Sequence, residues 1–155
     1  MTAPILIVGI GNPSRGDDAL GPLLVERLTA LNLAGIELLT DFQLQIEYAI
    51  DLQGREKVIF VDASIGGAEP YQFKQIEPAA DSSYSSHALS PAALLQTYRQ
   101  LYGEPPAAWV LAIRGYEFEL GKGLSPQAVH NLEQALSCMT SSCATTSKQK
   151  GHHDG

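Results

Sequence analysis

The sequence is short of basic residues, holds only two cysteines and contains no long hydrophobic run. Its 155 residues include 10 Lys and Arg against 17 Asp and Glu, for a formal net charge of −7. A chain of this sign repels phosphate backbones, and no basic cluster offsets the repulsion, so nucleic-acid binding is not expected. No apolar run reaches the roughly 18 residues that a membrane span needs, so no membrane association is expected either.

Both cysteines, Cys138 and Cys143, lie near the end of the chain in a stretch rich in serine and threonine. Two cysteines in this place do not support a disulfide framework or a cysteine nucleophile. The N-terminus has no basic region and no small-residue cleavage site, so the sequence predicts no signal peptide and a cytoplasmic protein.

Hydrophobic patterns predict strands and helices in alternation. Apolar runs typical of buried strands lie at 4–10, 36–40, 58–61 and 109–113. A run of alternating polarity, typical of an edge or antiparallel strand, lies at 71–76. Helical spacing predicts three amphipathic helices. Their apolar faces consist of Leu20, Leu23, Leu24, Leu28 and Leu31 in the first, of Ile46, Ala49 and Ile50 in the second, which spans 44–52, and of Val129, Leu132 and Leu136 in the last. Ser90-Pro91 opens a predicted helix over 92–101, and Ser125-Pro126 opens the final one.

This order of elements predicts an α/β fold. We expect a single-domain three-layer sandwich over residues 1–137, with a twisted, mostly parallel sheet of about five strands flanked by helices on both faces. Residues 138–155, which include His152 and His153, are rich in Ser, Thr, Lys and His and are predicted to form a disordered tail.

Aspartates follow three of the predicted strands. Asp17 and Asp18 come after the first, Asp41 ends the second, and Asp62 ends the third. Because ligands of open α/β sheets bind at the carboxyl ends of the strands, these carboxylates predict a functional pocket. A structural role is as plausible as a functional one for some of them: one of Asp17 and Asp18, or Asp41, could cap the helix that follows it. Asp62 has no following helix to cap, which favours a functional role.

His87, in the serine-rich loop before residue 90, is the histidine best placed to join these acids. Two carboxylates and one imidazole suit a divalent metal with open positions, although a solvated loop histidine is the commoner case. The segment GIGNPSRG is a partial match to a dinucleotide fingerprint, but Ser14 stands where the third glycine belongs. Asp17 and Asp18 would also repel a pyrophosphate, which disfavours a nucleotide.

Five segments, in this order, resemble the hydrogenase maturation proteases. They are GIGNPSRGDDALGPLLVERL, DFQLQIEYAIDL, VIFVDASIGG, SSHALSPAALL and GYEFELGKGLSPQAV, and the resemblance covers Ile5 to Leu136. The second segment is most similar to the branch that serves NAD-reducing or bidirectional hydrogenases. Members of this family are endopeptidases that trim the C-terminus of the large-subunit precursor of nickel–iron hydrogenases.

The resemblance implies a role for each candidate residue. The nickel-contacting groups of the family fall on Asp18, Asp62 and His87, and the acid linked to activity or substrate recognition falls on Asp41. Relatives often have a D-x-G-T pattern after the second strand, where this chain has Asp41 followed by Phe-Gln-Leu. The implied nickel is supplied by the substrate precursor, no organic cofactor is expected, and the family implies a monomer.

Two other functions stay open from the sequence. A metal-site chaperone would bind the precursor through the same three side chains without cutting it. A nucleotide-binding α/β enzyme would be stabilised by NAD or ATP. Cleavage of a nickel-loaded precursor separates the protease from both alternatives.

Overall fold

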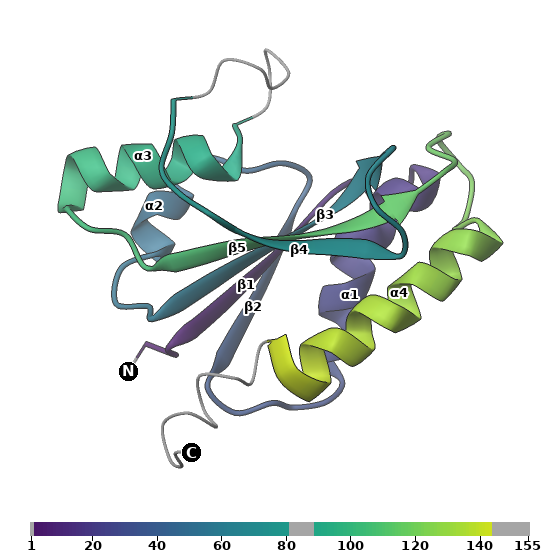
Figure 1. Cartoon of the computed structure of the whole chain (residues 1–155), viewed down its shortest axis with the longest axis horizontal. Coiled ribbons are helices and arrows are strands. Elements are labelled where there is room, and N and C mark those ends of the chain that lie inside the picture. Colours follow the sequence, from purple (N-terminus) through teal and green to yellow (C-terminus); the bar gives the residue numbers. More distant parts are fainter. Residues whose placement is uncertain (1, 81–88, 144–155) are drawn as a thin grey trace.

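One five-stranded sheet organises the chain, which a computed structural model describes over residues 2–80 and 89–143. In chain order the elements are β1 (Ile5–Ile10), η1 (Gly16–Ala19), α1 (Leu20–Thr29), β2 (Ile36–Asp41), α2 (Tyr48–Asp51), β3 (Lys57–Ile65), β4 (Tyr71–Ile76), α3 (Pro91–Tyr102), β5 (Ala107–Gly115), α4 (Pro126–Cys138) and η2 (Met139–Cys143). The strand order across the sheet is β2-β1-β3-β5-β4 (Figure 1). All pairings are parallel except that of β4 with β5.

Helices cover both faces of the sheet. α1 and α4 lie on one face, and α2 and α3 lie on the other (Figure 1). Because the strands alternate their side chains between these faces, each face has its own buried cluster, with Ile7 and Val61 in one and Val8 and Phe60 in the other. The predicted α/β sandwich is therefore confirmed, including the antiparallel edge strand at 71–76. Among the residues described, no helix has the length and apolar content needed to cross a membrane.

Several predicted helix faces differ from those observed. The helix expected over 44–52 is only the single turn α2, which buries Ala49 and leaves Ile46 and Ile50 exposed. Because α1 ends at Thr29, Leu31 lies beyond the apolar face predicted to include it and is exposed. Val129 likewise points away from the buried face of α4, which Ala128, Leu132 and Ala135 form.

Packing continues past the expected domain end at residue 137. α4 runs to Cys138, and Met139 in the following turn is fully buried beside α1 and α4. Met139 extends the spacing of Ala128, Leu132 and Ala135, so the apolar face is one turn longer than predicted. Cys138 is disulfide-bonded, which the sequence pattern did not predict. Residues 144–155 lie outside the described residues.

The first turn of α1 lies directly on β1 and β3. A Cβ atom added to Gly21 would come within 2.6 Å of the carbonyl oxygens of both Ile10 and Val61. One added to Gly9 would lie 2.6 Å from the carbonyl oxygen of Gly21. Two glycines that face each other therefore set how closely the start of α1 approaches the carboxyl ends of the central strands.

We expect Gly21→Ala to destabilise the protein by about 1–3 kcal/mol, although alanine is the better helix former. The added methyl group meets backbone atoms, which cannot rotate away. Gly123→Ala is the control, because nothing lies within 4 Å of its Cβ position. Urea unfolding of both variants measures the difference, and equal midpoints would contradict this account of the helix contact.

Candidate active site

The sheet reverses its direction of growth at β1. The connection from β1 through α1 leads to β2 on one side, and the connection from β2 through α2 leads back across β1 to β3. These two connecting helices lie on opposite faces. A strand order that reverses in this way opens a crevice at the carboxyl ends of β1 and β3, where ligands of α/β sheets bind.

Asp62 lies on β3 at this crevice, level with the end of β1. It does not end its strand as predicted, because β3 continues to Ile65. It is half-buried, and its Oδ1 accepts a hydrogen bond of 2.8 Å from the N–H of Ala63. The pKa of Asp62 is raised to about 7, chiefly by burial and also by the negative charge of Asp18, while the hydrogen bond from Ala63 opposes the rise. The site therefore holds a carboxyl group that exchanges its proton near neutral pH.

Asp18 lies in η1, close enough for its charge to act on Asp62. Its Oδ2 accepts a 2.7 Å hydrogen bond from the N–H of Asn12, and no side chain caps either η1 or α1. The capping alternative for Asp18 was therefore wrong. Gly11 has a φ of +146°, and a Cβ there would lie 2.0 Å from the carbonyl oxygen of Asp18. Only glycine at position 11 lets η1 fold back over the end of β1.

Asp41 lies at the same edge of the sheet but on the other side of β1. It pairs with Ile10, while Val61, the residue before Asp62, pairs with Gly9. The two acids therefore stand at one height, separated by two strand spacings of about 4.8 Å each. The structure thus brings Asp18 and Asp62 together and leaves Asp41 beside them as a separate group.

Asp41 has its own surroundings. Its carboxylate accepts hydrogen bonds from the N–H of Phe42 at 2.7 Å and from the hydroxyl of Tyr48 at 2.9 Å. Burial, the bond to Asp41 and the charges of Asp41 and Asp51 raise the pKa of Tyr48 to about 12. A hollow of about 380 Å³ adjoins this group, with Glu47 and Asp51 in its lining. Asp41 does not cap α2, because the N-cap residue of that helix is Glu47, which makes no side-chain cap, so that alternative was also wrong.

The predicted site residue His87 lies outside the described residues. Its flanking segments meet at the start of α3, where the N–H of Ala79 donates to the carbonyl oxygen of Ala92 at 3.1 Å. Figure 1 shows α3 running opposite to β5, so its first turn lies toward the carboxyl ends of the parallel strands. Over 2–80 and 89–143, no group of three His, Cys, Asp or Glu side chains is gathered to hold a metal. Asp18 and Asp62 are two potential ligands only.

Asp17, next in sequence to Asp18, is fully buried and anchors a distant loop. Its carboxylate accepts hydrogen bonds from the N–H groups of Tyr116, Glu117 and Ser125 at 2.7, 3.0 and 2.8 Å, and from the Ser125 hydroxyl at 2.7 Å. Burial alone would raise the pKa of Asp17, but these bonds outweigh it and lower the pKa below the ordinary value of 3.8. Local sequence patterns do not reveal this role, because the donors lie about a hundred residues away.

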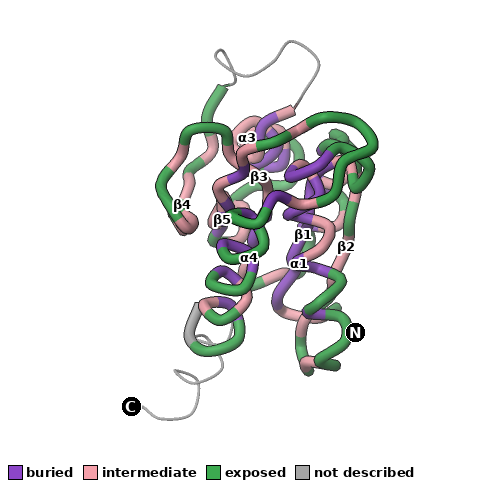
Figure 2. The backbone as a smooth tube through the Cα atoms, turned by 90° about the vertical axis from the view of Figure 1, so that its right-hand side faces the viewer, coloured by how far each residue is buried: buried purple, intermediate pink, exposed green. Residues whose placement is uncertain are grey.

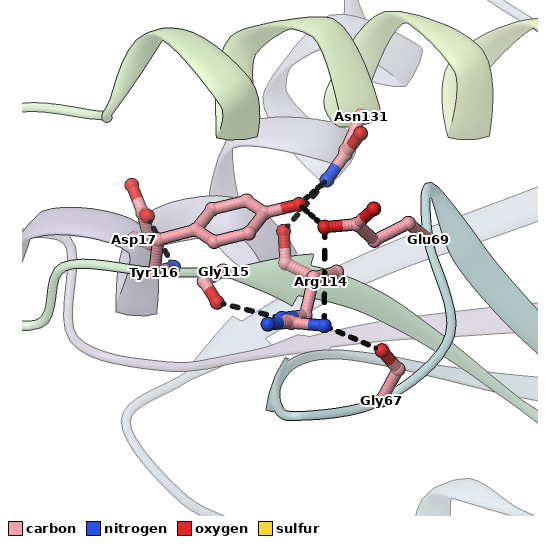
Figure 3. A network of polar contacts seen from close by, with 7 residues as sticks. All are labelled: Asp17, Gly67, Glu69, Arg114, Gly115, Tyr116 and Asn131. Carbon is pink, nitrogen blue, oxygen red and sulfur yellow. Dashed lines mark hydrogen bonds and ion pairs between the residues drawn. The ribbon is translucent and has the colours of Figure 1, made fainter.

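A second polar network holds the loop that Asp17 anchors (Figure 3). The hydroxyl of Tyr116 donates to Glu69 at 2.5 Å and accepts from the side-chain amide of Asn131 at 3.1 Å. The guanidinium of Arg114 lies 4.8 Å from the centre of the Tyr116 ring and donates to the carbonyl of Gly67 at 2.9 Å. The chain after β5 is thereby tied to α4, to the turn between β3 and β4, and to η1.

We expect Asp17→Asn to lower the free energy of unfolding at pH 7 by about 2–4 kcal/mol, because a buried anion with four donors is lost. A lowered pKa in the folded state contributes stability above the unfolded pKa, and that contribution disappears as the pH falls through the folded value. The gap between wild type and variant should therefore shrink below about pH 4. Urea unfolding at pH 7, 5 and 3 tests this, with the exposed Glu117→Gln as a charge-matched control. A gap that does not change with pH would contradict the assignment.

Neither a protein-family model nor a curated protein sequence matches the chain. Its fold is similar to that of the hydrogenase maturating endopeptidase HybD from E. coli, with 25% identity, 93% of each chain covered and a TM-score of 0.77. It is also similar to the nickel–iron hydrogenase maturation protease HycI from Thermococcus kodakarensis KOD1, with 25% identity, 88% of this chain and 90% of that chain covered, and a TM-score of 0.71. The structural neighbours of this chain are thus hydrogenase maturation proteases, the family that its sequence motifs predicted.

Proposed function

We propose that this protein is an endopeptidase that removes the C-terminal extension from the nickel-loaded large-subunit precursor of a nickel–iron hydrogenase. The observation that carries the proposal is the pair Asp18 in η1 and Asp62 on β3, beside the carboxyl end of β1, with an Asp62 pKa near 7. The maturation endopeptidases with the same fold support the kind of reaction and the kind of substrate. The branch that serves NAD-reducing hydrogenases and the cytoplasmic location stay predictions from the sequence.

The acid pair suits recognition of a metal that arrives with the substrate. Two carboxylates close together disfavour each other's ionisation, and a divalent cation between them reverses that effect. Nickel presented by the precursor would take oxygen ligands from Asp18 and Asp62, with the imidazole of His87 as the proposed third ligand. A site of this kind engages a precursor that already holds nickel and passes over one that does not.

Hydrolysis requires a water molecule that attacks the scissile carbonyl carbon while a base accepts its proton. Two routes fit the proposed site: the substrate nickel lowers the pKa of a bound water, or a carboxylate takes the proton directly. The pKa of Asp62 near 7 describes the site before the precursor binds, because a bound cation would stabilise the ionised carboxylate and lower that pKa. In the second route the carboxylate oxygen that does not contact nickel would accept the proton. The proton then passes to the leaving amine as the peptide bond breaks.

Asp41 is proposed to serve substrate recognition. The hollow beside it is lined by three acidic side chains, those of Asp41, Glu47 and Asp51, and no basic residue lines it. Such a lining favours a basic group on the precursor and repels an acidic one. Because Asp41 stands across β1 from Asp18 and Asp62, a segment held there would reach the acid pair without displacing it.

Incubation with a nickel-loaded precursor tests the proposed reaction. We expect wild type to shorten the large subunit, and Asp62→Ala to slow cleavage by at least about 100-fold while leaving the fold intact. Glu119→Ala, which alters an exposed acid in the loop after β5, should cleave at the wild-type rate. Mass spectrometry of the subunit measures the outcome. Binding without shortening would indicate a metal-site chaperone, and full activity of Asp62→Ala would refute the site assignment.

The carboxylate of Asp62 should also lower the free energy of unfolding at neutral pH. Its pKa rises from 3.8 in the unfolded chain to about 7 in the folded protein, so the unfavourable burial of the anion is absent below about pH 4 and complete above about pH 7. We therefore expect Asp62→Asn to be more stable than wild type by about 1–2 kcal/mol at pH 8, after allowance for solvent screening. The two should converge at pH 4. Guanidinium unfolding at both pH values, with Glu119→Gln as control, measures this difference.

A further inference from the structure

Two adjoining hollows form a groove beside the free edge of β2. One, of about 370 Å³, lies between α1 and β2, and the other, of about 250 Å³, lies at the end of β2 next to Asp41. Both are lined by Pro13, Pro22 and Thr40, so they are continuous. The groove runs along α1 and ends at the edge of the sheet that carries the aspartates.

β2 is an edge strand with no neighbour on its outer side among the described residues (Figure 2). The carbonyl oxygen of Asp41 accepts a hydrogen bond of 3.0 Å from the N–H of Gly11, so the backbone of Asp41 faces inward. In a parallel ladder, alternate residues face the same neighbour, so the backbone groups of Leu38 and Thr40 face outward. These are the β2 residues that line the larger hollow. The outward-facing N–H and C=O groups of β2 therefore belong to the same residues that line the groove.

The lining also restricts what the groove can hold. Most of it is apolar or weakly polar, from prolines, Leu23, Val25 and Leu38 together with two threonines. The charged side chains in the lining of the two hollows are Glu26 and Asp41, and both are acidic. A segment with apolar or basic side chains complements this groove, whereas an acidic segment is repelled.

We infer that an extended segment of the precursor's C-terminal extension binds in this groove as an additional strand on β2. Backbone hydrogen bonds to Leu38 and Thr40 would give affinity, and alternate side chains facing α1 would give selectivity for an apolar sequence. The six residues of β2 match a segment of about 20 Å. This inference rests on the proposed function, because it takes the occupant from the proposed substrate.

Hydrogen exchange tests the binding mode without requiring cleavage. The Asp62→Asn variant is mixed with nickel-loaded precursor, and exchange of the β2 amides is followed by mass spectrometry. We expect exchange at Leu38 and Thr40 to slow by about tenfold or more, because their N–H groups become paired. The mature subunit, which lacks the extension, is the matched control and should give no protection. Unchanged exchange in the presence of the precursor would overturn the inference.

A proline scan of the two sheet edges tests the same contact through kinetics. Thr40→Pro removes an outward N–H of β2 without removing a bond to β1, and we expect KM for the precursor to rise about tenfold with little change in kcat. Gln75→Pro makes the equivalent change on β4 at the opposite edge and should leave KM unchanged. Glu26→Lys, which reverses a charge of the groove, supplies a second variant if Thr40→Pro does not fold.

The two proposals fail in different ways. Protection of β2 without shortening of the precursor by wild type would support the binding mode and refute the protease. Cleavage by wild type with an unchanged KM in Thr40→Pro and no protection of β2 would refute the binding mode and leave the protease. Absence of both protection and cleavage would refute both.

Discussion

The close contact between the start of α1 and the end of β1 is the constraint on which the candidate site depends. Gly9 and Gly21 let the helix touch the sheet backbone, and Gly11 lets η1 fold back over the end of the strand. A side chain at any of these positions would meet backbone atoms at 2.9 Å or less. Because η1 carries Asp18, this contact is what brings Asp18 within electrostatic range of Asp62 on β3.

Two neighbouring aspartates have opposite roles at this contact. Asp17 points inward, where four donors keep its carboxylate charged and lower its pKa. Asp18 points toward the crevice, where its charge adds to the burial that raises the pKa of Asp62. The first residue stabilises the fold, and the second adds to the burial that makes ionisation of Asp62 unfavourable. The stability that Asp17 contributes therefore offsets the unfavourable burial of the Asp62 carboxylate when no cation neutralises it.

The sequence predicted the sheet well because its central strands are buried on both faces. A continuous apolar run as short as 58–61 is typical of a strand between two layers of helices, and that is where β3 lies. Asp62, which follows this run, was predicted to end the strand, but β3 continues to Ile65, so Asp62 lies inside the strand and level with the end of β1. The edge strand 71–76 was found by its alternating polarity. Local patterns of this kind are enough to predict a residue's burial wherever its own strand determines that burial.

Predictions failed where tertiary contacts decide the outcome. The spacing of Ile46 and Ile50 is helical, yet α2 is too short to bury either side chain. Asp17 has no local signal that separates it from Asp18, because its partners follow β5 and begin α4. The burial of Met139 depends likewise on α1, which lies more than a hundred residues away in the sequence.

The free edge of β2 and the acid pair are connected through backbone bonds rather than through mobile side chains. The carbonyl of Asp41 accepts from the N–H of Gly11, and the N–H of the next residue, Asn12, donates to the carboxylate of Asp18. Two consecutive N–H groups thus link the last residue of β2 to the first acid of the pair. A strand added to β2 would extend a sheet that already fixes the height of Asp41, Asp18 and Asp62. The position of a bound segment along β2 would therefore determine which of its peptide bonds lies nearest the acid pair.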